Sequence, residues 1–241
     1  LVVLALGMAL LMSLSFVNSG PAGGADAAGL SNEGQAELLV HASTFGTYFG
    51  QLVVAALGVL VISGEYSTGM IRSTLAAVPT RLPALAAKAV VLFAVTFVMA
   101  TISAIGAFFV ASAVFADAGI TANLFDSAVI LPLLGSALYL SLVALFALGV
   151  GTMLRSGAGG IATVVGVLLV LPVVLQMIPA EWAQDVLPYV LPTAGVGLFS
   201  GVGAFSDSAA EPRFWEDLAI VLAWVAVPIA GATVLLKRRD A

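Results

Sequence analysis

The sequence has no cysteine, a single histidine and few charges, and each shortage excludes a class of function. Without cysteine there are no disulfides, no thiolate nucleophiles and no cysteine-ligated metals. His41 cannot build a metal cluster by itself, so we expect no metal site. The 8 bases are outnumbered by 13 acids and form no run long enough to neutralise a phosphate backbone, which excludes nucleic-acid binding.

Apolar residues take the place of the missing charges. Of 241 residues, 61% are hydrophobic and 9% are charged, with a mean hydropathy of +1.17, whereas soluble domains are about half apolar and a quarter charged. Because a helix needs ~20 apolar residues to cross a bilayer, the chain holds enough for about six spans and little more. We therefore expect an all-α polytopic membrane protein in which residues 1–241 form a single transmembrane domain.

Apolar windows and the distribution of basic residues predict the topology. The predicted spans lie near 1–17, 39–63, 84–115, 127–153, 160–179 and 216–236. An even number of spans puts both termini on one side, and every base except Arg213 falls on that side. These bases are Arg72, Arg81, Lys88, Arg155, Lys237, Arg238 and Arg239. The positive-inside rule makes that side the cytoplasm, so we expect a multi-pass protein with both termini cytoplasmic.

The first apolar segment has two interpretations. Leu1 already lies inside an apolar run, with no methionine and no cationic flank before it, so the true N-terminus is missing or an unusual start is written literally. Small residues after Val17 fit a signal-peptide core. The missing basic flank and the downstream spans favour a first transmembrane helix instead.

The segment 180–215 is predicted to form a hairpin on the outer face. Val186 to Phe205 is apolar for long enough to cross the membrane, but it contains two prolines and four glycines. A crossing there would also turn the basic tail outward, against the charge rule. Both observations favour a re-entrant or interfacial hairpin of short helices, with glycines 195–203 as turn residues.

The residues needed for catalysis or ion coupling are absent. The only lysines, Lys88 and Lys237, do not follow a glycine-rich phosphate loop, so the chain is not an ATPase by itself. No predicted span places Asp, Glu, His or Lys near the bilayer centre, where ion-coupled transporters carry them. Paired acids and activated serines at depth are missing too, which excludes an intramembrane enzyme and leaves no catalytic residue to name.

One cytoplasmic connection, residues 64–83, has an informative pattern. Ser67 or Thr68 can cap a short helix that ends at Pro79. Ile71, Leu75 and Val78 then form an apolar ridge at i, i+4 and i+7. Such a ridge suits a groove on another protein, and it equally suits an interfacial helix resting on lipid headgroups.

This connection resembles a known family. The run GEYSTGMIRSTLAAVPTR over 64–81, with Lys88 at the start of the next span, is similar to the first cytoplasmic loop of ABC-2 type permeases, the membrane subunits of many bacterial ABC exporters. The positions that match are Glu65, Tyr66, Gly69, Met70, Ile71, Arg72, Thr74, Leu75, Pro79 and Arg81. The six-span layout and the outer hairpin agree with the same family. The family usually begins with a cytoplasmic amphipathic helix, which this sequence does not include.

The resemblance implies a function. The loop would be a coupling helix that docks on a separate ATP-binding subunit, which holds ATP and Mg²⁺, while this chain binds no cofactor. Glu65 would lie at the hinge and Arg72 would reach a carboxylate or a carbonyl. A second permease copy or a paralogue would complete the exporter in a bacterial inner or plasma membrane. The rival interpretation is a membrane scaffold without transport, whose loop binds some other cytosolic protein.

Two further groups of residues are candidates. Ala42, Gly46 and Gly50 recur every four residues on the second span and allow close helix packing, within the subunit in preference to a dimer seam. The predicted translocation path is lined by Phe45, Tyr48, Phe49, Gln51 and Gln176. Such an apolar, weakly hydrogen-bonding lining fits a hydrophobic or amphipathic cargo better than an inorganic ion.

Overall fold

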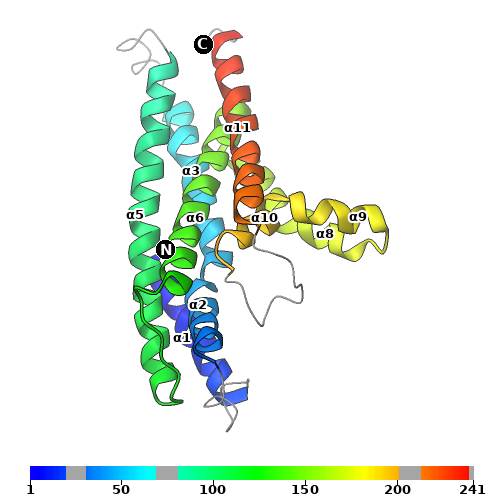
Figure 1. Cartoon of the computed structure of the whole chain (residues 1–241). Coiled ribbons are helices and arrows are strands. Elements are labelled where there is room, and N and C mark those ends of the chain that lie inside the picture. Colours follow the sequence, from blue (N-terminus) through cyan, green and yellow to red (C-terminus); the bar gives the residue numbers. More distant parts are fainter. Residues whose placement is uncertain (20–30, 69–80, 201–212, 239–241) are drawn as a thin grey trace. The chain divides into compact units, whose positions relative to one another are not determined.

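The structure is a computed structural model that describes residues 1–19, 31–68, 81–200 and 213–238. Every regular element in these ranges is a helix and none is a strand, which confirms the predicted all-α class (Figure 1). The elements are α1 (Val2–Ser19), α2 (Asn32–Thr44), α3 (Thr47–Thr68), α5 (Arg81–Ala116), α6 (Ser127–Leu154), α7 (Gly157–Val165), η2 (Gly166–Val170), α8 (Leu171–Met177), α9 (Glu181–Val186), η3 (Leu187–Tyr189), α10 (Leu191–Gly197) and α11 (Phe214–Arg238).

Five helical segments of the described chain are long and apolar enough to cross a membrane. They are Asn32–Gly64, Pro83–Ala116, Ser127–Leu154, Gly157–Met177 and Phe214–Leu235. The remaining expected span, the first in the chain at 1–17, is an apolar helix over Val2–Asn18 that is shorter than these five. The chain is therefore a helical protein with the features of a membrane protein, and its sixth crossing stays a prediction.

The second apolar segment starts earlier than hydropathy predicts. The expected span begins at residue 39, whereas α2 begins at Asn32 and is capped by Ser31, whose side chain accepts a hydrogen bond from the Gly34 amide at 3.2 Å. Polar residues such as Glu33 occupy this first turn, so an apolar window does not detect it. A turn at residues 45–46 separates α2 from α3.

The segment Gly157–Met177 contains a turn of π-helix. Residues Gly166–Val170 form η2, in which the Leu171 amide bonds the Gly166 carbonyl five residues back. Pro172 follows directly. Because proline has no backbone N–H, it cannot donate a hydrogen bond to the Leu168 carbonyl one turn earlier. A wider turn accommodates the missing bond, which explains why the π-helix lies here.

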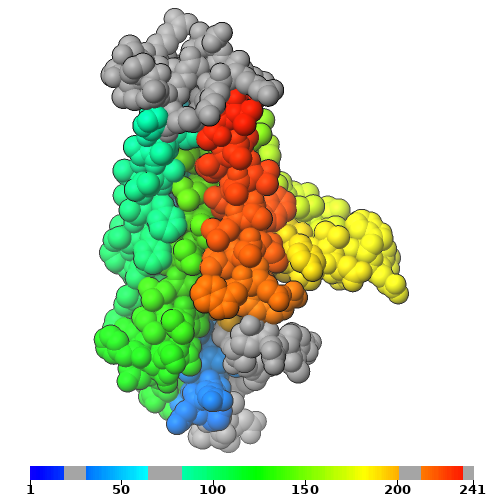
Figure 2. Space-filling view, turned by 45° about the horizontal axis from the view of Figure 1, so that its top comes forward, coloured from blue at the N-terminus to red at the C-terminus, as the bar shows by residue number. Residues whose placement is uncertain are grey.

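Short helices are present before the last span, as expected, but Gly195 and Gly197, predicted as turn residues, belong to the helix α10. After α8 come α9, η3 and α10. One compact unit contains η2, α8, α9 and η3, together with most of α10 and α11. In that unit α8 and α9 lie side by side and project away from α11 (Figure 1). Figure 2 shows the same yellow hairpin beside the orange half of α11. Leu175, Ala183 and Val190 form its small core. The expected hairpin, 180–215, begins after α8, and its residues 201–212 lie outside the described residues, so its form and its side of a membrane stay predictions.

The chain divides into two compact units, which we describe separately. The first contains residues 1–50, 98–138 and 196–214, and the second contains residues 51–97, 139–195 and 215–241. The first unit has a continuous core from α2, the C-terminal part of α5 and the start of α6, including Leu39, Phe115 and Leu133. A smaller core of the second unit joins Ile62, Leu85, Leu148 and Ala232.

Candidate functional site

The predicted coupling residues lie at and between the ends of two helices. Glu65 and Tyr66 belong to the last turn of α3, which extends to Thr68, and Arg81 is the first residue of α5. The expected connection 64–83 is therefore helical at both ends, where α3 extends to Thr68 and α5 begins at Arg81. The remaining coupling residues, together with the apolar ridge, lie outside the described residues; they are Gly69, Met70, Ile71, Arg72, Thr74 and Leu75.

Three of the predicted path residues form an aromatic cluster in the first unit. The ring of Phe45 lies 5.8 Å from that of Tyr48 and 6.2 Å from that of Phe49. Phe199, distant in sequence, joins them edge-on, with its centroid 5.9 Å from that of Tyr48. Tyr48 and Phe49 are 37% and 44% exposed. The cluster is thus a partly exposed aromatic surface, and its role in a translocation path stays a prediction.

The two predicted glutamines have different environments. Gln51 is buried in the second unit, and its side-chain oxygen accepts a hydrogen bond from the Tyr139 hydroxyl, whose ring is also buried. Gln176 is exposed on α8. Gln51 therefore holds α3 against α6 in this structure, and its role as a lining residue stays a prediction.

Two polar side chains at the end of α2 are satisfied by their own helix. The hydroxyls of Ser43 and Thr44 donate to carbonyls four residues earlier, at 2.5 and 2.8 Å. His41 is partly buried beside Phe16 and Phe45, with ring centroids 5.9 and 6.3 Å away.

The predicted small-residue motif lies at a helix contact of the first unit. Ala42, Gly46 and Gly50 are all buried. A Cβ atom on Gly46 would lie 2.8 Å from the Cα of Ala5 on α1, closer than real Cβ atoms approach. Only glycine fits at this crossing, so Gly46 brings α1 and the α2–α3 turn together within the chain.

Sequence reasoning missed the glycines that pack the second unit. Gly58 of α3 faces the backbone of Ala144 on α6, and Gly151 faces the backbone of Val59 in return. A Cβ atom on Gly149 would lie 2.9 Å from the carbonyl carbon of Pro228 on α11. The signal was present as Gly149 and Gly151, two residues apart in one predicted span. The spacing alone does not reveal which helices they contact.

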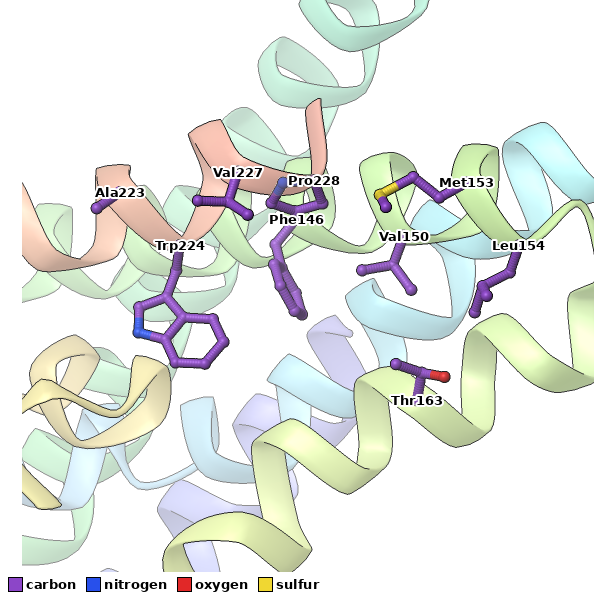
Figure 3. A pocket seen from close by; sticks show the side chains of 9 residues that line it. All are labelled: Phe146, Val150, Met153, Leu154, Thr163, Ala223, Trp224, Val227 and Pro228. Carbon is purple, nitrogen blue, oxygen red and sulfur yellow. The ribbon is translucent and has the colours of Figure 1, made fainter. Parts of the chain in front are cut away.

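Sequence reasoning also missed a pocket between α6, α7 and α11 of the second unit. It has a volume of about 470 Å³, within the ~300–1,000 Å³ usual for ligand sites. Its lining residues are Phe146, Val150, Met153, Leu154, Thr163, Ala223, Trp224, Val227 and Pro228. Figure 3 shows Trp224 near one end, Leu154 at the other, and Thr163 facing α6 from α7. The Trp224 ring packs edge-on against Phe146, with centroids 6.1 Å apart.

Nothing in the described residues provides a metal centre. No group of three or more His, Asp or Glu side chains comes together in those parts of the chain. The pocket also lacks a charged lining residue. This pocket therefore offers mainly apolar and aromatic contact.

Comparison with known proteins gives no relative for this chain: no family model, no curated protein and no solved structure matches it. Any family assignment depends on the residues of the chain itself.

Proposed function

We propose that this chain is the transmembrane permease subunit of an ATP-driven ABC exporter. The observation that carries the proposal is the residue pattern over 64–81, with its acid and aromatic at the end of one helix, its central arginine and its Pro-x-Arg ending. The ends of α3 and α5 on either side support it, because a rigid helix at each end of a docking loop can transmit its movement.

The composition of the helices supports the same function. The candidate spans carry few charged residues, so few groups are available there to bind a driving ion or to relay protons. Energy then has to come from a partner, here an ATP-binding subunit with its ATP and Mg²⁺. The exposed aromatic cluster around Tyr48 favours a hydrophobic or amphipathic cargo.

The test introduces a charge on the apolar ridge of the loop. Ile71→Asp or Leu75→Asp would bury an unpaired carboxylate in the groove of the partner, so we expect the ATP-binding subunit to be lost almost completely from the purified complex. Ser73→Asp is the matched control, because it adds the same charge beside the ridge and should keep the partner. The measurement is the stoichiometry of the ATP-binding subunit at matched membrane expression, together with ATPase activity and transport.

The outcomes separate the alternatives. If Ile71→Asp and Leu75→Asp both keep the partner and still transport, the loop is an interfacial helix and the docking role is wrong. If a cytosolic partner is lost from these variants but the wild-type complex neither hydrolyses ATP nor transports, the chain is a scaffold. ATPase activity of the chain purified away from every other protein would contradict the assignment as a permease subunit.

A further inference from the structure

The ring of Tyr139, on α6, contacts both α3 and α10. Its hydroxyl donates a hydrogen bond to the side-chain oxygen of Gln51 on α3. The ring also lies against Gly195 of α10, where an added Cβ atom would overlap it and lie 2.6 Å from Cζ, the carbon that carries the hydroxyl. Tyr139, Gln51 and Gly195 are all buried. Three helices therefore meet at one side chain, through residues that all belong to the second unit.

The ring has little freedom to move independently of its two contacts. Separating the Tyr139 hydroxyl from Gln51 would leave two buried polar groups unsatisfied, which is costly away from water. On the other side no Cβ atom lies between the ring and the α10 backbone, and closely packed groups cannot slide past each other without displacement. A shift of α3 at Gln51 would therefore move the ring and, through it, α10.

Of the three helices, α10 depends most on its neighbours for its position. It has seven residues, Leu191–Gly197, and helices shorter than ~12 residues are not stable by themselves. Leu191 and Ala194 are buried along with Gly195. Glycine is a poor helix former, so helix propensity does not account for Gly195, whereas the Tyr139 ring does. The contact with α6 thus sets where α10 lies.

The helix α3 connects this contact to the proposed docking loop. It is continuous from Thr47 to Thr68, so Gln51 and Glu65 lie on one helix, about 21 Å apart at ~1.5 Å per residue. We infer that Tyr139 is a positioning residue that transmits movement of α3 to α10. The inference rests on the proposed function, because the docked ATP-binding subunit is what moves the Glu65 end of α3.

The absence of cysteine allows a single introduced thiol to report on α10. Ala194 is buried, so Ala194→Cys in the full chain in nanodiscs should react with a thiol reagent only when α10 opens. Gln51→Leu and Tyr139→Phe should each raise the labelling rate about threefold to 20-fold, the factor equivalent to ~0.6–1.7 kcal/mol for one hydrogen bond between membrane helices. Together they should raise it no further, because both remove the same bond.

Matched controls separate this link from a general loss of stability. Val59 is fully buried on α3, two turns beyond Gln51, so Val59→Ala should destabilise the chain but change labelling of α10 by less than about twofold. Gly195→Ala forces the ring and α10 apart and should raise labelling at least about fivefold. Gly64→Ala, at a position with nothing within 4 Å of an added Cβ atom, should not raise it.

Transport measures whether the link is used. In the complex with the ATP-binding subunit, Tyr139→Phe should keep the partner and its ATPase activity but lower transport per ATP hydrolysed about fivefold, at the lower end of ordinary coupling between sites. A purely structural role would reduce the amount of assembled complex and leave this ratio unchanged. Val59→Ala should leave the ratio at its wild-type value.

Three results would overturn the inference. Equal labelling of α10 in Gln51→Leu and Val59→Ala, or additive effects of Gln51→Leu and Tyr139→Phe, would show that Tyr139 does not link α3 to α10. An unchanged ratio of transport to hydrolysis in Tyr139→Phe would show that the link transmits nothing. Failure of the proposed function has a different signature, a wild-type chain that captures no ATP-binding subunit, and the labelling rates decide the link in either case.

Discussion

The most apolar stretches of α6 and α11 have nearly the same hydropathy, yet their burial within the protein differs greatly. In the most apolar window of each, 72% of α6 is buried but only 22% of α11. α6 carries small residues where neighbours cross it, including Gly135, Ala144, Ala147, Gly149 and Gly151. Hydropathy therefore governs entry into the membrane, whereas residue size governs which helix the others pack around.

The largest expected difference between the two helices is the effect of removing a leucine. Leu148 of α6 is fully buried, so Leu148→Ala should leave a cavity and lower the free energy of unfolding by about 2–5 kcal/mol. Leu222 of α11 is 46% exposed, so lipid or detergent can fill the gap, and Leu222→Ala should change it by only about 0.5 kcal/mol. Unfolding in sodium dodecyl sulfate measures both. Equal losses would show that α11 is also covered, for example by a second copy.

A smaller difference is expected between two glycines of α3. A Cβ atom on Gly58 would collide with the Ala144 backbone of α6, so Gly58→Ala should destabilise the protein by about 1–3 kcal/mol. A Cβ atom on Gly64, further along the same helix, would meet no atom within 4 Å, and Gly64→Ala should be neutral or stabilise the helix by about 0.5–1 kcal/mol. Thermal unfolding in one detergent compares the two. The close α3–α6 contact is wrong if Gly58→Ala is as stable as Gly64→Ala.

The smallest expected difference concerns two tyrosines. Tyr139→Phe removes the buried hydrogen bond to Gln51 and should cost about 0.6–1.7 kcal/mol, the range for hydrogen bonds between membrane helices. Tyr189 is 55% exposed, so Tyr189→Phe should have no measurable effect. A double-mutant cycle with Gln51→Leu isolates the pair, and a coupling energy of zero would mean that this bond does not hold α3 against α6.

The expected spans agree with the structure best where apolar residues alone define them. The windows 84–115, 127–153 and 216–236 lie within a few residues of α5, α6 and α11. The start of α2 was missed because its first turn is polar and depends on the Ser31 cap. At 36 residues, or about 54 Å, α5 is also longer than the ~30 Å hydrocarbon core, so a helix does not end where the membrane does.

The candidate sites were predictable to different extents. The aromatic residues Phe45, Tyr48 and Phe49 are close in sequence, and their cluster follows from helical spacing, but the arrival of Phe199 does not. The polar character of Gln51 suggested a lining role. In the structure, however, its side-chain oxygen accepts a hydrogen bond from the buried Tyr139, 88 residues later. A side chain's chemistry is readable from the sequence, but the partner that satisfies it is not.

The sequence by itself determined that this protein is helical, apolar enough for a membrane and, lacking cysteine, without disulfides, because these properties depend on residue type and local period. Only the tertiary structure decided that α6 is the most buried of the candidate spanning helices, that Gly58 and Gly149 lie at close crossings, and that α6, α7 and α11 enclose an apolar pocket. These features depend on which helices meet. Helices of equal hydropathy gain similar free energy from the membrane, so only the shapes of their surfaces select the neighbours.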